Sequence, residues 1–423
     1  MVGTMAKIDD SVKKKVPELR FKGFTDDWEE RKLSDISNVT KLAGFEFTKY
    51  VRYQESGKII ALRGLNVKNG KLVLDEVKYI DDSDFSKLNR SKLYKNDILL
   101  TYVGTVGELA IVPENDKYYL APNVARIRLQ DHVNSIFVCQ MMNDSNFYNR
   151  IISPLIATSS QPALSMENVR KFQLLMPDYQ EQEKIGSFFK QLDDTIALHQ
   201  RKLDLLKEQK KGFLQKMFPK NGSRVPELRF SGFADDWEER KLGEFSDVRD
   251  GTHASPKYVS QGHPMVTSKN LTHSGLDMTD VSFLTDEDFN EINKRSKVSI
   301  GDILFGMIGT IGNPVIVDRD DFAIKNVALI KEKTSNPITN KWLLQYLKSP
   351  SFNRFIQKEN AGGTQKFIAL GLIRDMKLRV PEFDEQQKIG AFFKKIDETI
   401  TLHQRKLDLL KEQKKGFLQK MFV

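Results

Sequence analysis

The sequence predicts an α+β protein in which two related globular domains of mixed α/β structure are each followed by a long coiled-coil helix. Two of the three observations behind this prediction are repeats. Residues 16–33 (VPELRFKGFTDDWEERKL) recur at 225–242 with two changes, and residues 199–218 (HQRKLDLLKEQKKGFLQKMF) recur unchanged at 403–422. The third observation is that apolar residues around the second block are spaced alternately by four and three residues, as in a coiled coil. The repeat periods are far too long for a solenoid, so each copy is a domain with its connector.

The length and composition of the chain exclude several classes of protein. Its 423 residues exceed one compact core and indicate about two to four domains. With a single cysteine, Cys139, the sequence has neither an intrachain disulfide nor a cysteine-rich zinc site. Residues 1–15 have no apolar core and end in three lysines, so we expect a disordered extension and no signal peptide. No stretch approaches 18 consecutive apolar residues, so we expect no membrane partner and a cytoplasmic location.

Each copy is expected to open with a short helix and to continue as a sheet. In the first copy, Asp26-Asp27 can cap a helix whose apolar face contains Trp28 and Leu33, and the second copy repeats the pattern. Two β-rich runs, 58–67 and 71–77, are joined through Asn69-Gly70, which is a strong hairpin signal. Further strands are predicted over 98–103 and 109–112, with helices near 134–151 and 340–357.

The middles of the two copies diverge but keep a common skeleton. Four short motifs correspond between them, namely 96–99 with 301–304, 103–107 with 308–312, 123–125 with 326–328, and 159–161 with 363–365. Such a pattern indicates one fold that carries two different surfaces, as expected when two related sites read two ligands. Neutral drift after duplication is the alternative, but drift would not leave a 20-residue block identical while its neighbour diverges.

A long amphipathic helix closes each copy, with a coiled-coil seam over five heptads. The predicted seam residues are Ile185, Phe189, Leu192, Ile196, His199, Leu203 and Leu206 in the first copy, and Ile389, Phe393, Ile396, Ile400, His403, Leu407 and Leu410 in the second. Two matching seams in one chain most simply pack on each other. The polar seam residues His199, Lys210, His403 and Lys414 are expected to set register or partner, or in the case of the lysines to extend outward, and a catalytic or metal role is disfavoured.

The breaker-rich segment PKNGS at 219–223 ends the first helix. The expected organisation is therefore an extension at 1–15, a first domain at 16–178, a first helix at 179–218, a linker at 219–224, a second domain at 225–382, and a second helix at 383–423.

Sequence motifs for catalysis are absent. The chain has no GxxxxGK[ST] phosphate loop, no GxSxG elbow and no HExxH zinc motif, and its histidines lack metal-ligand spacing. Cys139 lies in an apolar run, which favours a buried structural thiol over a nucleophile. The sequence therefore indicates a reader with no catalytic residues and no metal of its own. Two alternatives remain, namely a two-domain coiled-coil scaffold that binds no DNA, and an enzyme whose site these motifs do not reveal.

Two variable middles that alternate with two near-identical helices closely resemble the DNA-specificity subunit of type I restriction-modification systems. The resemblance covers residues 16 to 423, and its most specific elements are EQ-x-KIG-x-FF-x-x-x-D and HQRKLDLLKEQKKGFLQKMF, each present twice. The GDIL stretch at 301–304 and the GGTQKF stretch at 362–367 also resemble the family's target-recognition domains. The first copy departs from this pattern, with Asn96 in place of the glycine and TSSQPAL at 158–164.

The resemblance implies a non-catalytic subunit with two target-recognition domains, each reading one half of a bipartite site in double-stranded DNA. It implies a pseudo-twofold internal repeat in which two long helices form an intramolecular antiparallel coiled coil that separates the domains and sets the spacer. It also implies partners, namely two methyltransferase subunits that carry S-adenosylmethionine and up to two ATP- and Mg-dependent restriction subunits. No cofactor is then expected on this chain.

A net charge of +9 is compatible with DNA but does not establish binding. Reading a duplex requires basic residues for phosphates, and Arg, Lys, Asn or Gln for base edges. The candidates in the first domain are Lys41, Lys49, Arg52, Arg63, Asn66, Lys68, Arg90, Lys92, Ser160 and Gln161. Those in the second domain are His253, Lys257, Lys269, Asn270, Lys294, Arg295, Lys297, Lys325, Thr364, Gln365 and Lys366. The loops around Gln161 and Gln365 are the strongest candidates for base contacts, because they are polar and matched in position.

Overall fold

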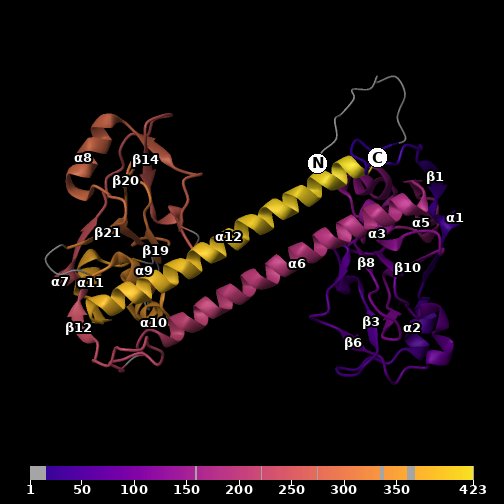
Figure 1. Ribbon diagram of the computed structural model, residues 1–423, viewed down its shortest axis with the longest axis horizontal. Coiled ribbons are helices and arrows are strands. Elements are labelled where there is room, and N and C mark those ends of the chain that lie inside the picture. The colour runs from indigo at the N-terminus through magenta and orange to yellow at the C-terminus, as the bar shows by residue number, and fades with distance from the viewer. Residues whose placement is uncertain are drawn as a thin grey trace. The chain divides into compact units, whose positions relative to one another are not determined.

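The computed structural model describes residues 16–157, 160–220, 222–273, 275–333, 338–359 and 367–422. These residues form two compact units, one made of 16–199 with 406–422 and the other of 200–405 (Figure 1). The units do not follow the sequence repeat, because each contains the first part of its own long helix and the last part of the other. The predicted extension at 1–15 lies outside the described residues.

The first unit is built on a four-stranded antiparallel sheet in the order β2-β10-β7-β8 and a three-stranded sheet in the order β6-β3-β9. A small hairpin, β4-β5, joins Val67 to Leu72 through Asn69 and Gly70, which both have positive φ, as the sequence predicted. The strands are β2 (Ser37–Lys41), β3 (Ile60–Leu62), β4 (Val67–Lys68), β5 (Lys71–Leu72), β6 (Lys78–Tyr79), β7 (Ile98–Thr101), β8 (Leu109–Ile111), β9 (Tyr118–Leu120) and β10 (Val124–Leu129). The helices are α2 (Gly44–Tyr50), α3 (Ser135–Met142), α4 (Ser145–Phe147) and α5 (Met166–Arg170), with shorter turns at η1 (Gly64–Asn66), η2 (Phe85–Lys87), η3 (Asn89–Ser91), η4 (Tyr148–Ile152) and η5 (Ser153–Leu155).

The four-stranded sheet of the first unit is buried on both faces. Ile98 and Leu100 of β7 point into one apolar cluster with α3, while Leu99 between them points into the cluster of the second sheet. Alternate residues of a strand face opposite sides, so an unbroken apolar strand requires a core on each side. This explains why the run at 98–100 is fully apolar.

The second unit has the same topology, with sheets β13-β21-β18-β19 and β17-β14-β20. This confirms the predicted α+β class and internal repeat. The strands are β13 (Ser246–Asp250), β14 (His263–Val266), β15 (Leu271–Thr272), β16 (Gly275–Leu276), β17 (Ser282–Leu284), β18 (Ile303–Gly306), β19 (Gly312–Ile316), β20 (Ala323–Ile324) and β21 (Val327–Glu332). The helices are α8 (Asp286–Ser296), α9 (Asn340–Lys348), α10 (Pro350–Glu359) and α11 (Leu370–Asp375), with one short turn at η6 (Ser268–Asn270).

The predicted opening helix is wrong in both copies. Residues 29–32 form a strand, β1 (Glu29–Lys32), which pairs antiparallel with β11 (Gln173–Met176), and only α1 (Leu33–Ile36) is helical. The second unit repeats this with β12 (Glu238–Lys241), β22 (Lys377–Val380) and α7 (Leu242–Phe245). Pairing with a distant strand overrides the local helix signal, while Trp28 and Leu33 are buried as expected.

The two long helices are α6 (Tyr179–Lys216) and α12 (Phe383–Met421), and none of the described helices is long and apolar enough to cross a membrane. Within each unit they run antiparallel. In the first unit Phe188 contacts Phe417 and Asp193 pairs with Lys414 at 2.8 Å. In the second unit Lys210 pairs with Asp397 at 2.6 Å. The predicted seam faces inward, and its two lysines are held by these ion pairs, which fix the register of the two helices.

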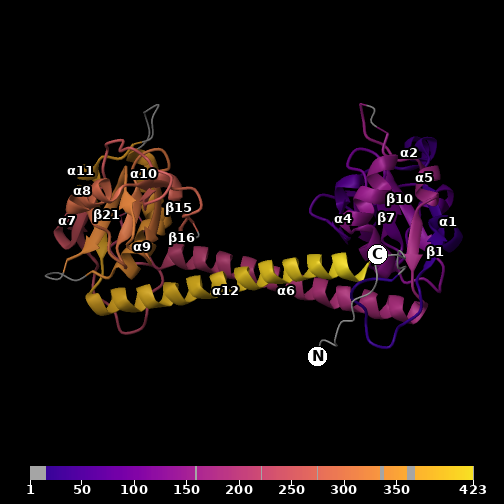
Figure 2. The same cartoon turned by 90° about the horizontal axis from the view of Figure 1, so that it is seen from above.

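The ends of the long helices complete the globular cores. Phe422 packs in the first unit against Trp28, Phe137 and Phe189, with ring centroids 5.4 to 6.5 Å apart. Figures 1 and 2 both show the C-terminal end of α12 at the globular part of that unit. Phe218 makes the corresponding contacts with Trp237 and Phe393 in the second unit. The core of each unit is therefore closed by the end of the helix that begins in the other copy.

A pair of buried ionic contacts joins the two constant sequence blocks. Glu181 at the start of α6 is fully buried and accepts two hydrogen bonds from Arg20, both at 2.7 Å. Glu385 and Arg229 repeat this geometry at 2.7 and 2.8 Å in the second unit. A two-pronged arginine–carboxylate pair fixes orientation as well as distance. It anchors the start of each long helix to the first segment of its own copy.

We expect the substitution Phe422→Ala to lower the free energy of unfolding of the first unit by about 3–5 kcal/mol, because it removes a buried ring from the core. Phe218→Ala is the matched variant and should weaken the second unit by a similar amount. Hydrogen–deuterium exchange read separately over the two units provides the measurement. Loss of protection in the second unit of the Phe422 variant, with the first unit unchanged, would contradict the assignment.

Candidate nucleic-acid interface

Two of the shared sequence motifs, 103–107 with 308–312 and 123–125 with 326–328, meet at one end of the four-stranded sheet in each unit. In the first unit Lys41 at the end of β2 pairs with Ala125, and Thr101 at the end of β7 pairs with Val124, so both strands end where β10 begins. In the second unit Asp250 pairs with Ala328 and Gly306 pairs with Val327 in the same way. We call this place the loop end of the sheet.

The loop that contains Gln161 lies against the loop end of the first unit. The Gly104 N–H donates to Pro162 O at 2.9 Å, and the Leu164 N–H donates to Tyr102 O at 2.8 Å. In the second unit the Ile368 N–H donates to Met307 O at 2.9 Å, so Ile368 is held at the strand end in the same way as Leu164. Ser160 and Gln161 are exposed, whereas Thr364, Gln365 and Lys366 lie outside the described residues.

Backbone conformation explains why the motifs at the loop end are shared. Gly104 and Gly309 have φ of 81° and 75°, and Asn123 and Asn326 have φ of 72° and 56°. Glycine adopts this left-handed conformation without strain, and asparagine adopts it more readily than other residues. The motifs therefore preserve the course of the loops, which leaves the neighbouring side chains free to differ.

The basic candidates of the first unit differ in their surroundings. Lys41 is exposed at the loop end, with Nζ 5.2 Å from the ring centroid of Tyr102. Arg90 is exposed, and its carbonyl accepts a hydrogen bond from Arg126 of β10. Lys49, Arg52 and Lys68 are exposed on α2, after α2, and on the β4-β5 hairpin. Arg63 and Lys92 are half-buried and lie beside Glu76 and Asp116 respectively.

Two asparagines predicted to read bases have a structural role instead. Asn66 is fully buried, where its Oδ1 accepts from the Arg63 N–H and its Nδ2 donates to the carbonyls of Val73 and Glu76. Asn270 repeats this arrangement with the N–H of Thr267 and the carbonyls of Asp277 and Asp280. Because their amides are used to hold these loops together, neither side chain is presented to a ligand.

His253, one of the candidates of the second unit, lies in a cluster of hydrogen-bonded and charged groups. Its Nε2 is 2.9 Å from Asp250 Oδ2 and its Nδ1 is 2.8 Å from Asn326 Oδ1. Both hydrogen bonds raise the pKa of His253 above its usual value, and the one with Asn326 has the larger effect. Asp250 also pairs with Arg295. Lys325 is half-buried and donates to Ser255 Oγ at 2.9 Å.

The other candidate lysines that the structure describes in the second unit are exposed. Lys269 pairs with Asp280 at 2.9 Å and Lys294 pairs with Glu291 at 2.5 Å. Lys257 and Lys297 are exposed in loops. Pairs of this kind are screened by solvent and readily exchange their partner for a phosphate.

Sequence reasoning missed Asp250, because an acidic residue is not an obvious DNA ligand. It occupies the register position that Lys41 occupies in the first unit, since each pairs with the alanine of the shared Asn-Val-Ala motif. A signal was present in the shared Arg-Ser-Lys triplet at 90–92 and 295–297, which aligns Arg90 with Arg295. Asp250 itself lies far from that triplet in the sequence, so only the fold brings it to Arg295.

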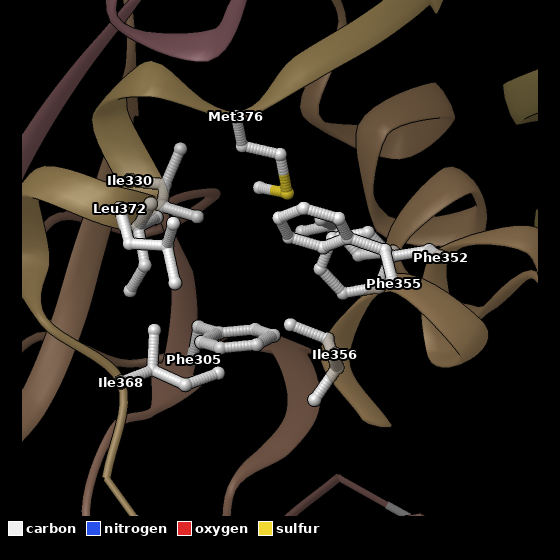
Figure 3. Close-up of a pocket in the computed structure, with 10 residues that line it drawn as sticks. Phe305, Ile330, Phe352, Phe355, Ile356, Ile368, Leu372 and Met376 are labelled. Atoms are coloured by element: carbon white, nitrogen blue, oxygen red, sulfur yellow. The ribbon is translucent and has the colours of Figure 1, made fainter. Parts of the chain in front are cut away.

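The enclosed pocket of the second unit is a gap in its core rather than a ligand site. Figure 3 shows Phe305, Phe352, Phe355 and other apolar side chains converging on it. Its volume is about 10 Å³, which holds at most one water molecule.

Burial raises the pKa of Cys139 to about 12, so this thiol is a poor nucleophile. No three His, Cys, Asp or Glu residues among those described lie close enough together to hold a metal ion.

Comparison with known proteins identifies a family. Residues 25–208 and 234–412 each match the model of the type I restriction modification DNA specificity domain. The type I restriction enzyme MjaVIII specificity subunit of Methanocaldococcus jannaschii is 23% identical over 416 residues, which covers 93% of this chain and 91% of that protein. The EcoBI specificity subunit of Escherichia coli is 31% identical over 129 residues, covering 30% of this chain and 27% of that protein.

The same fold is found among solved structures. The type I restriction-modification S subunit from M. genitalium has a TM-score of 0.65 at 14% identity, with 96% of this chain and 99% of that chain covered. A chain from a study of complex assembly and conformational transition of the type I R-M system has a TM-score of 0.52 at 16% identity, covering 93% and 97%. At these identities the likeness concerns the fold.

We expect Asn66→Ala to lower the free energy of unfolding by about 1–3 kcal/mol, because it leaves buried backbone groups without a partner. Asn270→Ala should have a similar effect in the second unit. Lys68→Ala, at an exposed position nearby, should change stability by less than about 0.5 kcal/mol. Denaturant unfolding followed by fluorescence measures the difference. Unchanged stability in both asparagine variants would contradict the structural role.

Proposed function

The chain belongs to the family of type I restriction-modification DNA-specificity subunits, and from this premise we propose that each of its units reads one half of a bipartite site in double-stranded DNA. The observation that carries the proposal is the loop end of the sheet. Its backbone motifs are shared by the two units, but its side chains differ, with Lys41 in one unit and Asp250 with His253 in the other. A common frame with different hydrogen-bonding groups suits the reading of two different base sequences.

We further propose that the chain itself is non-catalytic and acts within a larger complex. The sequence has no phosphate loop and no hydrolase elbow, and its one thiol is buried. S-adenosylmethionine, ATP and Mg would then act on partner subunits, namely two methyltransferase subunits and up to two restriction subunits. The paired helices would set the spacer between the half-sites, since 38 helical residues extend over ~57 Å.

Exposed leucines on the long helices support docking of the methyltransferase subunits on these helices. In the first unit Leu198 and Leu409 lie five residues from the Asp193–Lys414 pair, one on each helix, and are 65% and 47% exposed. In the second unit Leu205 and Leu402 lie five residues from the Lys210–Asp397 pair and are 51% and 68% exposed. Large apolar side chains held in solvent at matched positions are typical of a protein-binding surface.

Exchanging residues 34–176 for the corresponding segment of a relative should change one half of the recognised site and leave the other half and the spacer unchanged. The exchange keeps the constant blocks, including Arg20 and Glu181, so the long helices remain anchored. Mapping of methylated sites in cells that express the chain with its methyltransferase partner gives the readout. A change in both halves, or in neither, would count against modular reading.

Replacing Leu198 and Leu409 together by Glu should weaken binding of the methyltransferase subunits by at least tenfold, because charges would replace apolar contacts. The variant of Leu205 and Leu402 should have a similar effect, because these leucines lie two helical turns from Leu198 and Leu409 on the same faces of α6 and α12. Lys211→Gln with Lys415→Gln is the control, since it changes exposed positions about 120° around the helix from the leucines. Calorimetric titration and native mass spectrometry report affinity and stoichiometry. Undiminished binding of two subunits by either leucine variant would exclude docking on these leucines.

A further inference from the structure

Three segments of the second unit meet in a charged cluster at the loop end of its sheet. Asp250 ends β13, His253 follows in the next loop, and Arg295 lies in the last turn of α8. One carboxylate oxygen of Asp250 accepts from Arg295 and the other contacts His253. The Asp250 side chain is only 10% exposed whereas that of Arg295 is 68% exposed. The carboxylate therefore forms the base of the cluster, and the guanidinium group faces solvent.

The imidazole of His253 is fixed from both sides. Its two ring nitrogens face acceptor oxygens of Asp250 and Asn326, which is the environment of a ring that donates from both nitrogens. The backbone carbonyl of Asn326 accepts a hydrogen bond from Ser268 Oγ at 3.1 Å. The backbone of Asn326 also has the left-handed conformation of the shared motif. The cluster is thus tied to the rigid part of the loop end.

The first unit has the same arginine without the carboxylate. Arg90 and Arg295 each accept a hydrogen bond at 3.2 Å on their carbonyl from an arginine of the sheet, Arg126 and Arg249 respectively. Each is followed by a buried serine and a lysine. At the position of Asp250, however, the first unit has Lys41, whose ammonium group lies over Tyr102. The carboxylate that orients Arg295 is therefore specific to the second unit.

An arginine held by a carboxylate is suited to reading a base. Its side chain has lost much of its rotational freedom before the ligand arrives, so less entropy is lost on binding. Its remaining N–H groups match the paired O6 and N7 acceptors of guanine in the major groove. A phosphate gains less here than at an unpaired arginine, because the nearly buried carboxylate of Asp250 offsets one of the positive charges of the cluster.

We infer that Arg295 reads a guanine in the half-site bound by the second unit, and that Asp250 and His253 are positioning residues that hold it for this contact. The inference rests on the proposed function and extends it, because it names one residue and the base that this residue reads. It also assigns an asymmetry, because Arg90 in the first unit has no such support and need not select the same base.

The test uses the full chain in complex with its methyltransferase partner and a library of duplexes with every single-base change in both half-sites. For Arg295→Ala we expect the preference for guanine to fall by roughly 5- to 150-fold at one position of one half-site, with other positions unchanged. Asp250→Asn, which keeps the shape but removes the charge, should reduce the preference partially at that same position. A merely structural role would not produce a loss confined to one base pair.

Two control variants sharpen the test. Lys294→Ala, next to Arg295 and exposed, should alter methylation of all sequences alike, and Arg90→Ala should leave the guanine position unchanged. The inference is overturned if Arg295→Ala keeps the full preference, loses methylation uniformly over all sequences, or relaxes both half-sites. Thermal unfolding of each variant checks folding, and if Arg295→Ala unfolds, Asp250→Asn alone decides by the same criteria. A wild-type complex with no bipartite preference would instead refute the proposed function itself.

Discussion

The structure depends on one packing constraint, which is that each globular core is closed by the end of the helix from the other copy. Phe422 fills the core of the first unit against Trp28 and Phe189, and Phe218 fills that of the second unit. Because both helix ends carry the same sequence, both cores must present the same receiving surface. The ion pairs Asp193–Lys414 and Lys210–Asp397 then fix the register between α6 and α12. This register places each phenylalanine in the core that it fills.

This constraint accounts for the division of the sequence into constant and variable parts. The first constant block supplies the tryptophan of the core and the arginine that holds Glu181 or Glu385 at the start of the long helix. The following glutamine, Gln182 or Gln386, donates to a proline carbonyl just before the helix and accepts from the segment that leads into α3 or α9. These residues of the constant blocks serve assembly, whereas the loop end of the sheet is outside this network.

The loop end combines a fixed backbone with variable side chains. Glycine and asparagine with positive φ keep the course of the loops the same in both units, and strand pairing keeps their spacing the same. Within that frame a single register position carries a lysine in one unit and an aspartate in the other. The change alters the charge around the equivalent arginines Arg90 and Arg295 without disturbing the sheet. A duplicated fold can in this way present two different surfaces to a duplex.

The sequence by itself determined the repeat, the coiled-coil seam, the Asn69-Gly70 hairpin and the run of strands around residue 98, because each is written as a local or periodic pattern. It also indicated which loops correspond between the copies. Only the tertiary structure decided that residues 29–32 are a strand, that Asn66 holds a loop, and that Asp250 meets Arg295. Each of these depends on a partner that is distant along the chain or on burial that composition does not reveal. The sequence also does not reveal which helix end closes which core. The two helix ends are identical, so nothing local distinguishes the core that each one enters.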